Sequence, residues 1–191
     1  FFGDGATNIG AYNLLQRGAL LAQNGDVAIP GTLIVGAGPP AVTTNDNQGL
    51  WAKDASNPLR LIARSGSAAP GTGGALFDAL PELPAISDVG DVTFLASLRV
   101  GTGTPAVTAS NDTGLWTTGS VAGANPQPVL VAREGSALRS PSNAVITRFA
   151  TGCYATAGSG GAPVFSFFAT QADGKSGLYV MTMNAGSPLA A

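Results

Sequence analysis

The sequence repeats itself, and the spacing of the repeat limits the folds that are open to it. Residues 25–51 align without a gap with residues 90–116, an offset of 65 residues. Within this stretch the tripeptide Gly-Leu-Trp occurs twice, as Gly49–Trp51 and as Gly114–Trp116. Such a period is typical of arrays in which each repeat is one supersecondary unit that buries its apolar face against a neighbour.

The repeat continues in both directions along the chain. Leu61–Ala68 recurs as Leu130–Ala137 at an offset of 69, because the second copy has four extra residues in the turn Thr118–Gln127. A third copy is expected in Gly161–Phe165 and Gly177–Val180, with a middle loop eight residues shorter. The chain divides into a partial unit (1–21), repeat 1 (22–86), repeat 2 (87–151) and a truncated repeat 3 (152–191).

Each unit predicts four short antiparallel strands. Apolar residues alternate over 27–35, 92–100 and 164–169, the Gly-Leu-aromatic segment follows, and clusters of Gly, Pro, Asn and Asp separate the segments. No window has helical periodicity, and 27 glycines with 13 prolines oppose helices. The remaining strands are expected around Tyr12–Leu15, Phe77–Leu80, Leu59–Ala63 and Val129–Ala132. We therefore predict an all-β fold of about three propeller-like blades with incomplete ends.

The incomplete ends predict association between copies. The last unit lacks the Leu-Ile-Ala-Arg strand, and three blades are fewer than the roughly four to eight of known propellers. An unpaired edge strand is a template for another chain. We expect homo-oligomers, as rings or filaments, that form through the terminal repeats. The chain starts at Phe1, which predicts a processed product or a fragment of a larger protein.

The composition indicates the cell exterior and argues against several partners. Only 10% of the residues are charged, the net charge is −2, and histidine is absent. A surface so poor in charge suits an extracellular or cell-surface structural protein. The arginines form no basic stripe, which excludes a nucleic-acid partner. No apolar run approaches the roughly 20 residues of a transmembrane helix.

The repeat resembles the tandem repeats of bacterial exported proteins described as choice-of-anchor tandem repeat, NxxGxxAF-containing. The matching segments are Gly25–Ile29, Gly90–Phe94, Gly161–Phe165, the two Gly-Leu-Trp tripeptides and Ile62–Gly66. The name-giving Asn is replaced by Ala22 in the first copy and by Ser87 in the second. The resemblance implies export, attachment to the cell surface, a propeller-like fold and no catalytic residues.

The sequence has few of the side chains that enzymes commonly use in catalysis. Without histidine the chain has no Ser-His-Asp triad and no His-based zinc site, and its single cysteine excludes a cysteine cluster. A pair of carboxylates, as in glycosidases, remains open. Asp26 and Asp91 occupy the same repeat position, however, which indicates a role in a turn. We predict that the chain is no enzyme and needs no cofactor; a glycosidase is the third hypothesis.

An aspartate precedes each aromatic strand, as Asp46, Asp112 and Asp173. The surrounding Asn, Gly and Thr residues predict Asx-type turns, in which the side chain accepts hydrogen bonds from nearby backbone N–H groups. The alternative is a weak cation site, with calcium as the ion, because calcium prefers oxygen ligands.

Two further sets of residues recur at matched positions. Arg64 and Arg133 are expected to be buried against a carboxylate or carbonyl at the end of each blade, with a contact to an anion or a sugar as the alternative. Trp51, Trp116 and Tyr179 are expected in the core between blades. Their alternative role is as stacking platforms for a carbohydrate.

Two long loops, Val35–Gln48 and Val100–Thr113, each contain a G-x-G-x-x-A motif. No helix is predicted after either motif, so we reject a nucleotide-phosphate site and interpret both as turns. Loops of this length are often functional. The leading hypothesis is a non-catalytic structural repeat protein that self-assembles; the runner-up is a module that binds a carbohydrate or a peptide on these loops.

Overall fold

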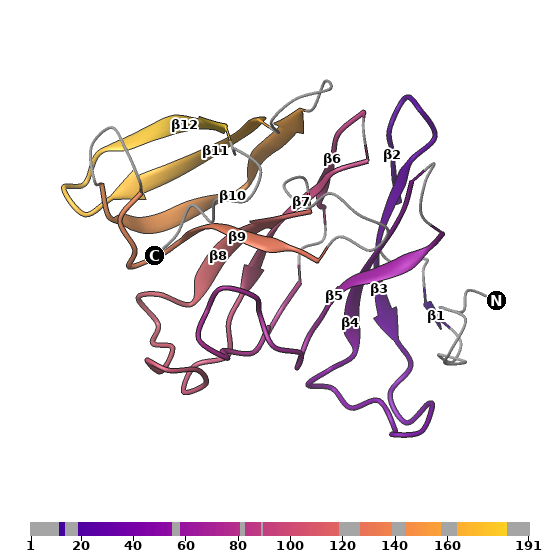
Figure 1. Ribbon diagram of the computed structural model, residues 1–191. Helices are drawn as coiled ribbons and strands as arrows, with labels where there is room; N and C mark the ends of the chain where they lie inside the picture. The colour runs from indigo at the N-terminus through magenta and orange to yellow at the C-terminus, as the bar shows by residue number, and fades with distance from the viewer. Residues whose placement is uncertain are drawn as a thin grey trace.

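The computed structural model consists of strands and loops (Figure 1). It describes residues 12–13, 19–54, 58–80, 83–88, 90–118, 127–138, 144–157 and 164–182, without the side chains of 12–13, 151–157, 165 and 182. The described residues form three open antiparallel sheets, which confirms the all-β prediction. They include no helix that could cross a membrane. The predicted features at residues 14–15, 119–126 and 161–163 lie outside the described residues.

Sheet 1 contains β1 (Tyr12–Asn13), β2 (Leu20–Leu21), β3 (Val27–Leu33), β4 (Gln48–Lys53) and β5 (Arg60–Arg64). Its order is β1-β3-β4-β5, and β2 also pairs with β3. Tyr12 pairs with Leu33 near one end of β3, whereas Leu20 pairs with Ala28 near the other end. The outer strand of this sheet is therefore split into two short pieces, and residues of the partial unit 1–21 complete the sheet of repeat 1.

Sheet 2 repeats this plan with β6 (Ala85–Ile86), β7 (Val92–Ser97), β8 (Thr113–Thr117) and β9 (Val129–Arg133) in the order β6-β7-β8-β9. An isolated bridge pairs Phe77 with Leu98, which is the Tyr12–Leu33 pair moved by 65 residues. The outer strand is again split. The short strands β2 and β6 were missed by the sequence analysis, because two residues are too few to show an alternating pattern.

Sheet 3 contains β10 (Ile146–Ala157), β11 (Val164–Gln171) and β12 (Ser176–Thr182). Its outer strand, β10, is long, irregular in register and was not expected. Phe167 pairs with Tyr179 as Phe94 pairs with Trp116, so the expected alignment of Phe165 with Phe94 is wrong by two residues. The irregular β10 hides this shift from sequence comparison. No strand pairs with β12 on its other side within the described residues.

A hairpin carries the chain from each sheet to the next. Ala68 pairs with Leu76 in this hairpin, and the N–H of Gly66 donates to the carbonyl of Phe77 at 2.8 Å. Because Phe77 also bridges to Leu98, the hairpin ties the end of β5 to sheet 2. The same arrangement recurs 69 residues later, where the N–H of Gly135 donates to the carbonyl of Ile146 at 2.8 Å.

The sheets stack face to face in the order 1, 2, 3, and each has two distinct faces. The aromatic face carries Trp51, Trp116 or Tyr179, and the leucine face carries Leu50, Leu115 or Leu178, because neighbouring residues of a strand point to opposite sides. Buried residues of the leucine face of sheet 1 form one core with the aromatic face of sheet 2. Those of the leucine face of sheet 2 form a second core with the aromatic face of sheet 3.

Candidate functional site at the loop end of the sheets

The two long loops, 34–47 and 99–112, have the same conformation. The N–H of Gly36 donates to the carbonyl of Val42 at 2.7 Å, and that of Gly101 donates to Val107 at 2.9 Å. Val42 and Val107 are buried and anchor the loops, whereas the Pro-Ala segments between them are exposed. The G-x-G-x-x-A motif lies in a turn between two strands in both copies and opens no helix.

An arginine from the next strand fastens each loop. Nε of Arg64 donates to the carbonyl of Asp46 at 2.7 Å, and Nη2 donates to its carboxylate at 3.0 Å. Arg133 makes the same two contacts with Asn111, at 2.7 Å to the carbonyl and 3.1 Å to the side-chain oxygen. The predicted carbonyl or carboxylate partners are present, whereas the predicted burial is not reached, because both arginines remain partly exposed. Burial lowers the pKa of Arg133.

The fastened residue is an aspartate in repeat 1 and an asparagine in repeat 2. Asp46 corresponds to Asn111 and not to Asp112, because Thr43 and Thr108 donate their backbone N–H to these two side chains, at 2.6 Å and 2.8 Å. An amide oxygen replaces a carboxylate oxygen as acceptor in the second copy. The aspartate of repeat 2 is therefore shifted by one residue, and the apparent recurrence of an aspartate is not a recurrence of one site.

The three aspartates considered for a cation bind other partners. Asp46 pairs with Arg64, and Asp173 pairs with Lys175 at 2.7 Å. The side chain of Asp112 accepts the hydroxyl of Thr113 at 3.3 Å. Asp173 also accepts the backbone N–H of Lys175 at 3.0 Å, which is the predicted Asx turn. Among the described residues, no three acidic or thiol side chains gather as a metal site would require.

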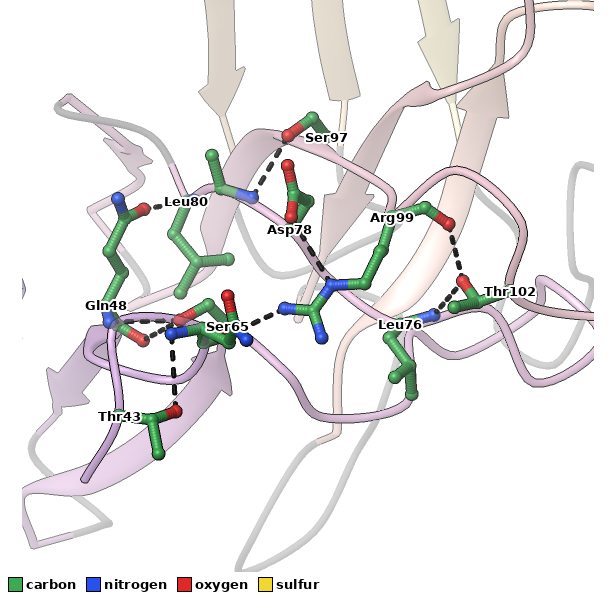
Figure 2. A network of polar contacts seen from close by, with 11 residues as sticks. Thr43, Gln48, Ser65, Leu76, Asp78, Leu80, Ser97, Arg99 and Thr102 are labelled. Atoms are coloured by element: carbon green, nitrogen blue, oxygen red, sulfur yellow. Dashed lines mark hydrogen bonds and ion pairs between the residues drawn. The ribbon is translucent and has the colours of Figure 1, made fainter. Parts of the chain in front are cut away.

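Arg99 joins the loop of sheet 1 to sheet 2 (Figure 2). Its Nη2 donates to the carbonyl of Asn45 at 2.8 Å, and its Nε lies 3.5 Å from the carboxylate of Asp78. Nearby, the side chain of Gln48 accepts the N–H of Leu80 at 2.8 Å. These contacts hold the segment 78–80, which follows the hairpin, and the end of β7 against sheet 1 and its long loop, so they form a polar joint between sheets 1 and 2.

Arg99 is not among the residues that the repeat predicts for a contact between sheets. Its repeat position is Ile34 in the first copy, where the side chain is largely exposed. A charged residue in place of an apolar one, within a stretch that otherwise aligns without a gap, was the available signal. The joint between sheets 2 and 3 uses other groups: the buried Glu134 accepts the N–H of Phe149 at 3.2 Å. Burial raises the pKa of Glu134.

A second acidic group, which is partly buried, lies at the opposite end of the first two sheets. Partial burial raises the pKa of Asp91, and the neighbouring charge of Asp54 adds to the effect. Asp54 itself forms an ion pair with the buried Arg60 at 2.9 Å. The repeat-equivalent Asp26 is fully buried, and its backbone N–H donates to the side chain of Asn24 at 3.0 Å. Both repeat-equivalent aspartates therefore lie at the strand entry, in the turn position that the sequence predicts.

The three recurring aromatic residues occupy the same face of their sheets and are buried or half-buried. Trp116 is fully buried between Phe77 and Phe94, with ring centroids 5.0 Å and 6.0 Å away. Tyr179 is half-buried and stacks on Phe167 at 5.4 Å. Trp51 is buried with Leu33 and Val42 on the aromatic face of sheet 1. The burial of the two tryptophans leaves neither indole face open to a carbohydrate. Trp116 lies in the core between sheets 1 and 2, as predicted, whereas Trp51 packs with residues of sheet 1 alone, so the prediction that it lies between two blades is wrong.

Comparison with known proteins places this array in a family. The family model described as "Family of unknown function (DUF7453)" matches residues 3–185. The chain belongs to this family. The DUF7453 match runs from before β1 to beyond β12, so all three sheets and both fastened loops fall within it. No curated protein and no solved structure matches the chain.

Replacing Asp46 with asparagine is expected to remove part of the acid sensitivity of folding. The hydroxyl and N–H of Thr43 together with Arg64 hold the pKa of Asp46 below its ordinary value of 3.8. A group with a lowered pKa stabilises the folded state above its unfolded pKa, and this contribution is lost as the pH falls through the folded pKa. We expect the variant to lose at most about 1 kcal/mol of unfolding free energy near neutral pH.

As the pH falls through the folded pKa of Asp46, the urea concentrations at which the two proteins unfold are expected to converge, because the carboxylate of the wild type becomes neutral. Urea unfolding at neutral pH and at strongly acidic pH measures the difference. Asn111→Asp is the matched control, since it introduces the carboxylate at the equivalent position and should add acid sensitivity. An equal deficit of D46N at both pH values would refute the assigned role of the charge.

Proposed function

We propose that this chain is a non-catalytic structural module of a protein at the cell exterior, that its sheets act as propeller-like blades, and that copies of it self-assemble. The observation that carries the proposal is one packing arrangement used twice: a leucine face against the aromatic face of the next sheet. An array built from a single repeated interface grows by adding units. The four strand positions of sheets 1 and 2 also match the unit of a propeller.

The use of charge supports a structural role. Four of the described aspartates form ion pairs with an arginine or a lysine at 2.7 to 3.5 Å. In three of these pairs the aspartate lies in a segment between strands; they are Asp54–Arg60, Asp46–Arg64 and Asp78–Arg99. Charges paired in this way hold the connecting segments in place, which is a structural role.

The composition and the family resemblance support the cell exterior. The chain has two lysines, no histidine and 10% charged residues, so hydroxyl, amide and backbone groups cover much of its surface. The resemblance to exported choice-of-anchor repeats rests mainly on two kinds of segment. The first is Gly25–Ile29 and Gly90–Phe94, where β3 and β7 begin, and the second is the Gly-Leu-Trp tripeptide of β4 and β8. In this proposal the repeats form an extracellular or surface-attached scaffold that needs no metal or cofactor.

If copies self-assemble, the particles in solution should have a mass that is a multiple of the mass of one chain. Light scattering at about 10 μM, a concentration at which modest protein contacts already form, measures the mass. Negative-stain microscopy of the same sample should show rings or filaments. A mass equal to one chain at every concentration tested would overturn self-assembly.

A second function, binding of a carbohydrate or a peptide, is favoured by the paired loops. Val35 and Val100 are both exposed at the start of identically folded loops, and such apolar surface commonly marks a contact site. Glycan and peptide arrays test this function. A ligand whose binding is lost when both valines are replaced by serine would favour binding over scaffolding, and an array without a specific signal would argue against it.

A further inference from the structure

The leucine face of sheet 3 is an apolar surface on which the described residues place no further sheet, unlike the leucine faces of sheets 1 and 2. It is formed by Val164, Ser166, Phe168, Leu178 and Val180, which alternate along β11 and β12 with residues of the core. Leu178 is 67% exposed and Val180 is 65% exposed. None of these five residues is charged. In Figure 1, sheet 3 lies at one end of the array and sheet 1 at the other.

The same positions are buried wherever another sheet follows. Leu50 and Leu115, which correspond to Leu178, are fully buried. Ala52 and Thr117, which correspond to Val180, are fully buried or nearly so. The cover in both cases is the aromatic face of the next sheet: Phe94 and Trp116 on sheet 1, and Phe167 and Tyr179 on sheet 2. The leucine face of sheet 3 is thus one half of an interface that the chain forms twice within itself.

The other half of that interface lies on the aromatic face of sheet 1. Leu61 is 36% exposed there, whereas its equivalent Leu130 is 5% exposed in the core between sheets 1 and 2. Ile29 is partly exposed, whereas its equivalent Phe94 is fully buried. Trp51 fills the middle of this face with Leu33 and Val42. The face therefore keeps the apolar character of its counterparts with less of its surface covered.

We infer that the leucine face of sheet 3 docks onto the aromatic face of sheet 1 of a second copy of this chain. The occupant is a second copy because the chain carries both halves of the interface, and because the two internal junctions already show how such halves pack. The contact joins two different faces, so it propagates head to tail; it gives a ring if the rotation closes and a filament if it does not. This inference rests on the proposed self-assembly and names its surface.

A charge on the leucine face of sheet 3 tests the contact. We expect Leu178→Asp to raise the dissociation constant of self-association by on the order of 100-fold, because the contact would bury an unpaired carboxylate. The thermal unfolding temperature of the single copy should change little, since this side chain is largely exposed in it. Val100→Asp is the control: Val100 is also exposed, at 59%, but lies in the loop after β7, and its variant should assemble like the wild type.

Mixing two variants separates head-to-tail contact from symmetric pairing. Leu61→Asp should block the aromatic face of sheet 1, and Leu178→Asp should block the leucine face of sheet 3. Each variant alone is expected to be a single copy in sedimentation velocity, and an equal mixture should form dimers, since one intact contact remains. If Leu61→Asp folds poorly, Ile29→Asp replaces it in the mixture.

The outcomes distinguish the two proposals. A wild type that stays a single copy overturns self-assembly itself, and the docking inference with it. A wild type that assembles together with a Leu178→Asp variant that assembles equally well overturns only the docking surface. Loss of assembly in Leu178→Asp, retention in Leu61→Asp and no rescue on mixing would overturn the head-to-tail contact in favour of symmetric pairing of two leucine faces.

Discussion

Replacement of Trp116 by alanine is expected to lower the unfolding free energy by about 3–5 kcal/mol. The indole is fully buried in the core between sheets 1 and 2, where it contacts Phe77 edge-on and stacks on Phe94. Its Nε1 donates to the carbonyl of Pro70, in the hairpin that connects the two sheets, at 3.0 Å. The substitution removes the largest side chain of this core and leaves a cavity that three different segments would have to fill. Urea unfolding followed by circular dichroism measures the loss.

Two further variants identify the source of this effect. Trp116→Phe keeps an aromatic ring but leaves the carbonyl of Pro70 without its donor, so a loss of about 1 kcal/mol attributable to the hydrogen bond is expected in addition to the smaller ring. Phe168→Ala removes a ring from the exposed leucine face of sheet 3 and should cost far less. If Phe168→Ala and Trp116→Ala destabilised the single copy equally, the assignment of Trp116 to the core between sheets would be wrong.

The repeat predicted most of the fold because each copy places the same residue types in the same strands. The Gly-Leu-Trp tripeptide predicted β4 and β8, and the Leu-Ile/Val-Ala-Arg segment predicted β5 and β9. An offset that is constant over many residues fixes both the strands and the loop that connects them. The internal hydrogen bonds of the two long loops follow the same offset, from Gly36 to Gly101.

The alignment of the repeats gives the wrong strand register in sheet 3. The alignment of the repeats places Phe165 of sheet 3 at the position of Phe94. The strand register instead places Phe167 there, because Phe167 pairs with Tyr179 as Phe94 pairs with Trp116. Phe165 and Phe167 lie two positions apart in one strand, so an alternating pattern cannot distinguish them. The register is fixed instead by packing against sheet 2, which sequence alone does not display.

The candidate site shows a similar limit. The arginines that fasten the loops were found because Arg64 and Arg133 recur, and their partners were predicted by chemistry as carbonyl or carboxylate groups. The identity of the second partner was missed, since Asn111 offers the same acceptor oxygen as Asp46 with no charge. Arg99 was missed because it occurs in one copy. Residues that recur in several units can be found by aligning the repeats. Contacts between two particular units can depend on a residue that occurs in one copy only, as with Arg99.

Replacement of Gly114 by alanine is expected to cost about 1–3 kcal/mol although it adds a single methyl group. Gly114 and Trp116 lie on the same face of β8, and the indole folds back over the glycine. A Cβ at position 114 would lie 2.6 Å from Cη2 and 2.8 Å from Cζ3 of Trp116. The ring cannot yield, because Phe77 and Phe94 hold it on the other sides. This contact gives a physical reason for the glycine in the repeated Gly-Leu-Trp tripeptide.

The third repeat supplies the matched control for this substitution. Gly177 holds the equivalent place before Tyr179, but a Cβ there would meet no atom within 4 Å. Tyr179 instead stacks on Phe167 and hydrogen-bonds the side chain of Gln171. Gly177→Ala should therefore be neutral or slightly stabilising, because alanine restricts the unfolded chain more than glycine does.

A double-mutant cycle identifies the indole as the cause of the cost at position 114. In the background of Trp116→Ala the methyl group of Gly114→Ala no longer meets the ring, and the remaining close atom is Cδ1 of Leu130, at 3.2 Å, the end of a flexible side chain. The second substitution should therefore add little to the first, and the two effects should be strongly non-additive. Urea unfolding of the two single variants and the double variant gives the coupling free energy. Additive losses, or a Gly177→Ala variant as unstable as Gly114→Ala, would show that the glycine is required for its backbone alone and that the tripeptide does not depend on the ring above it.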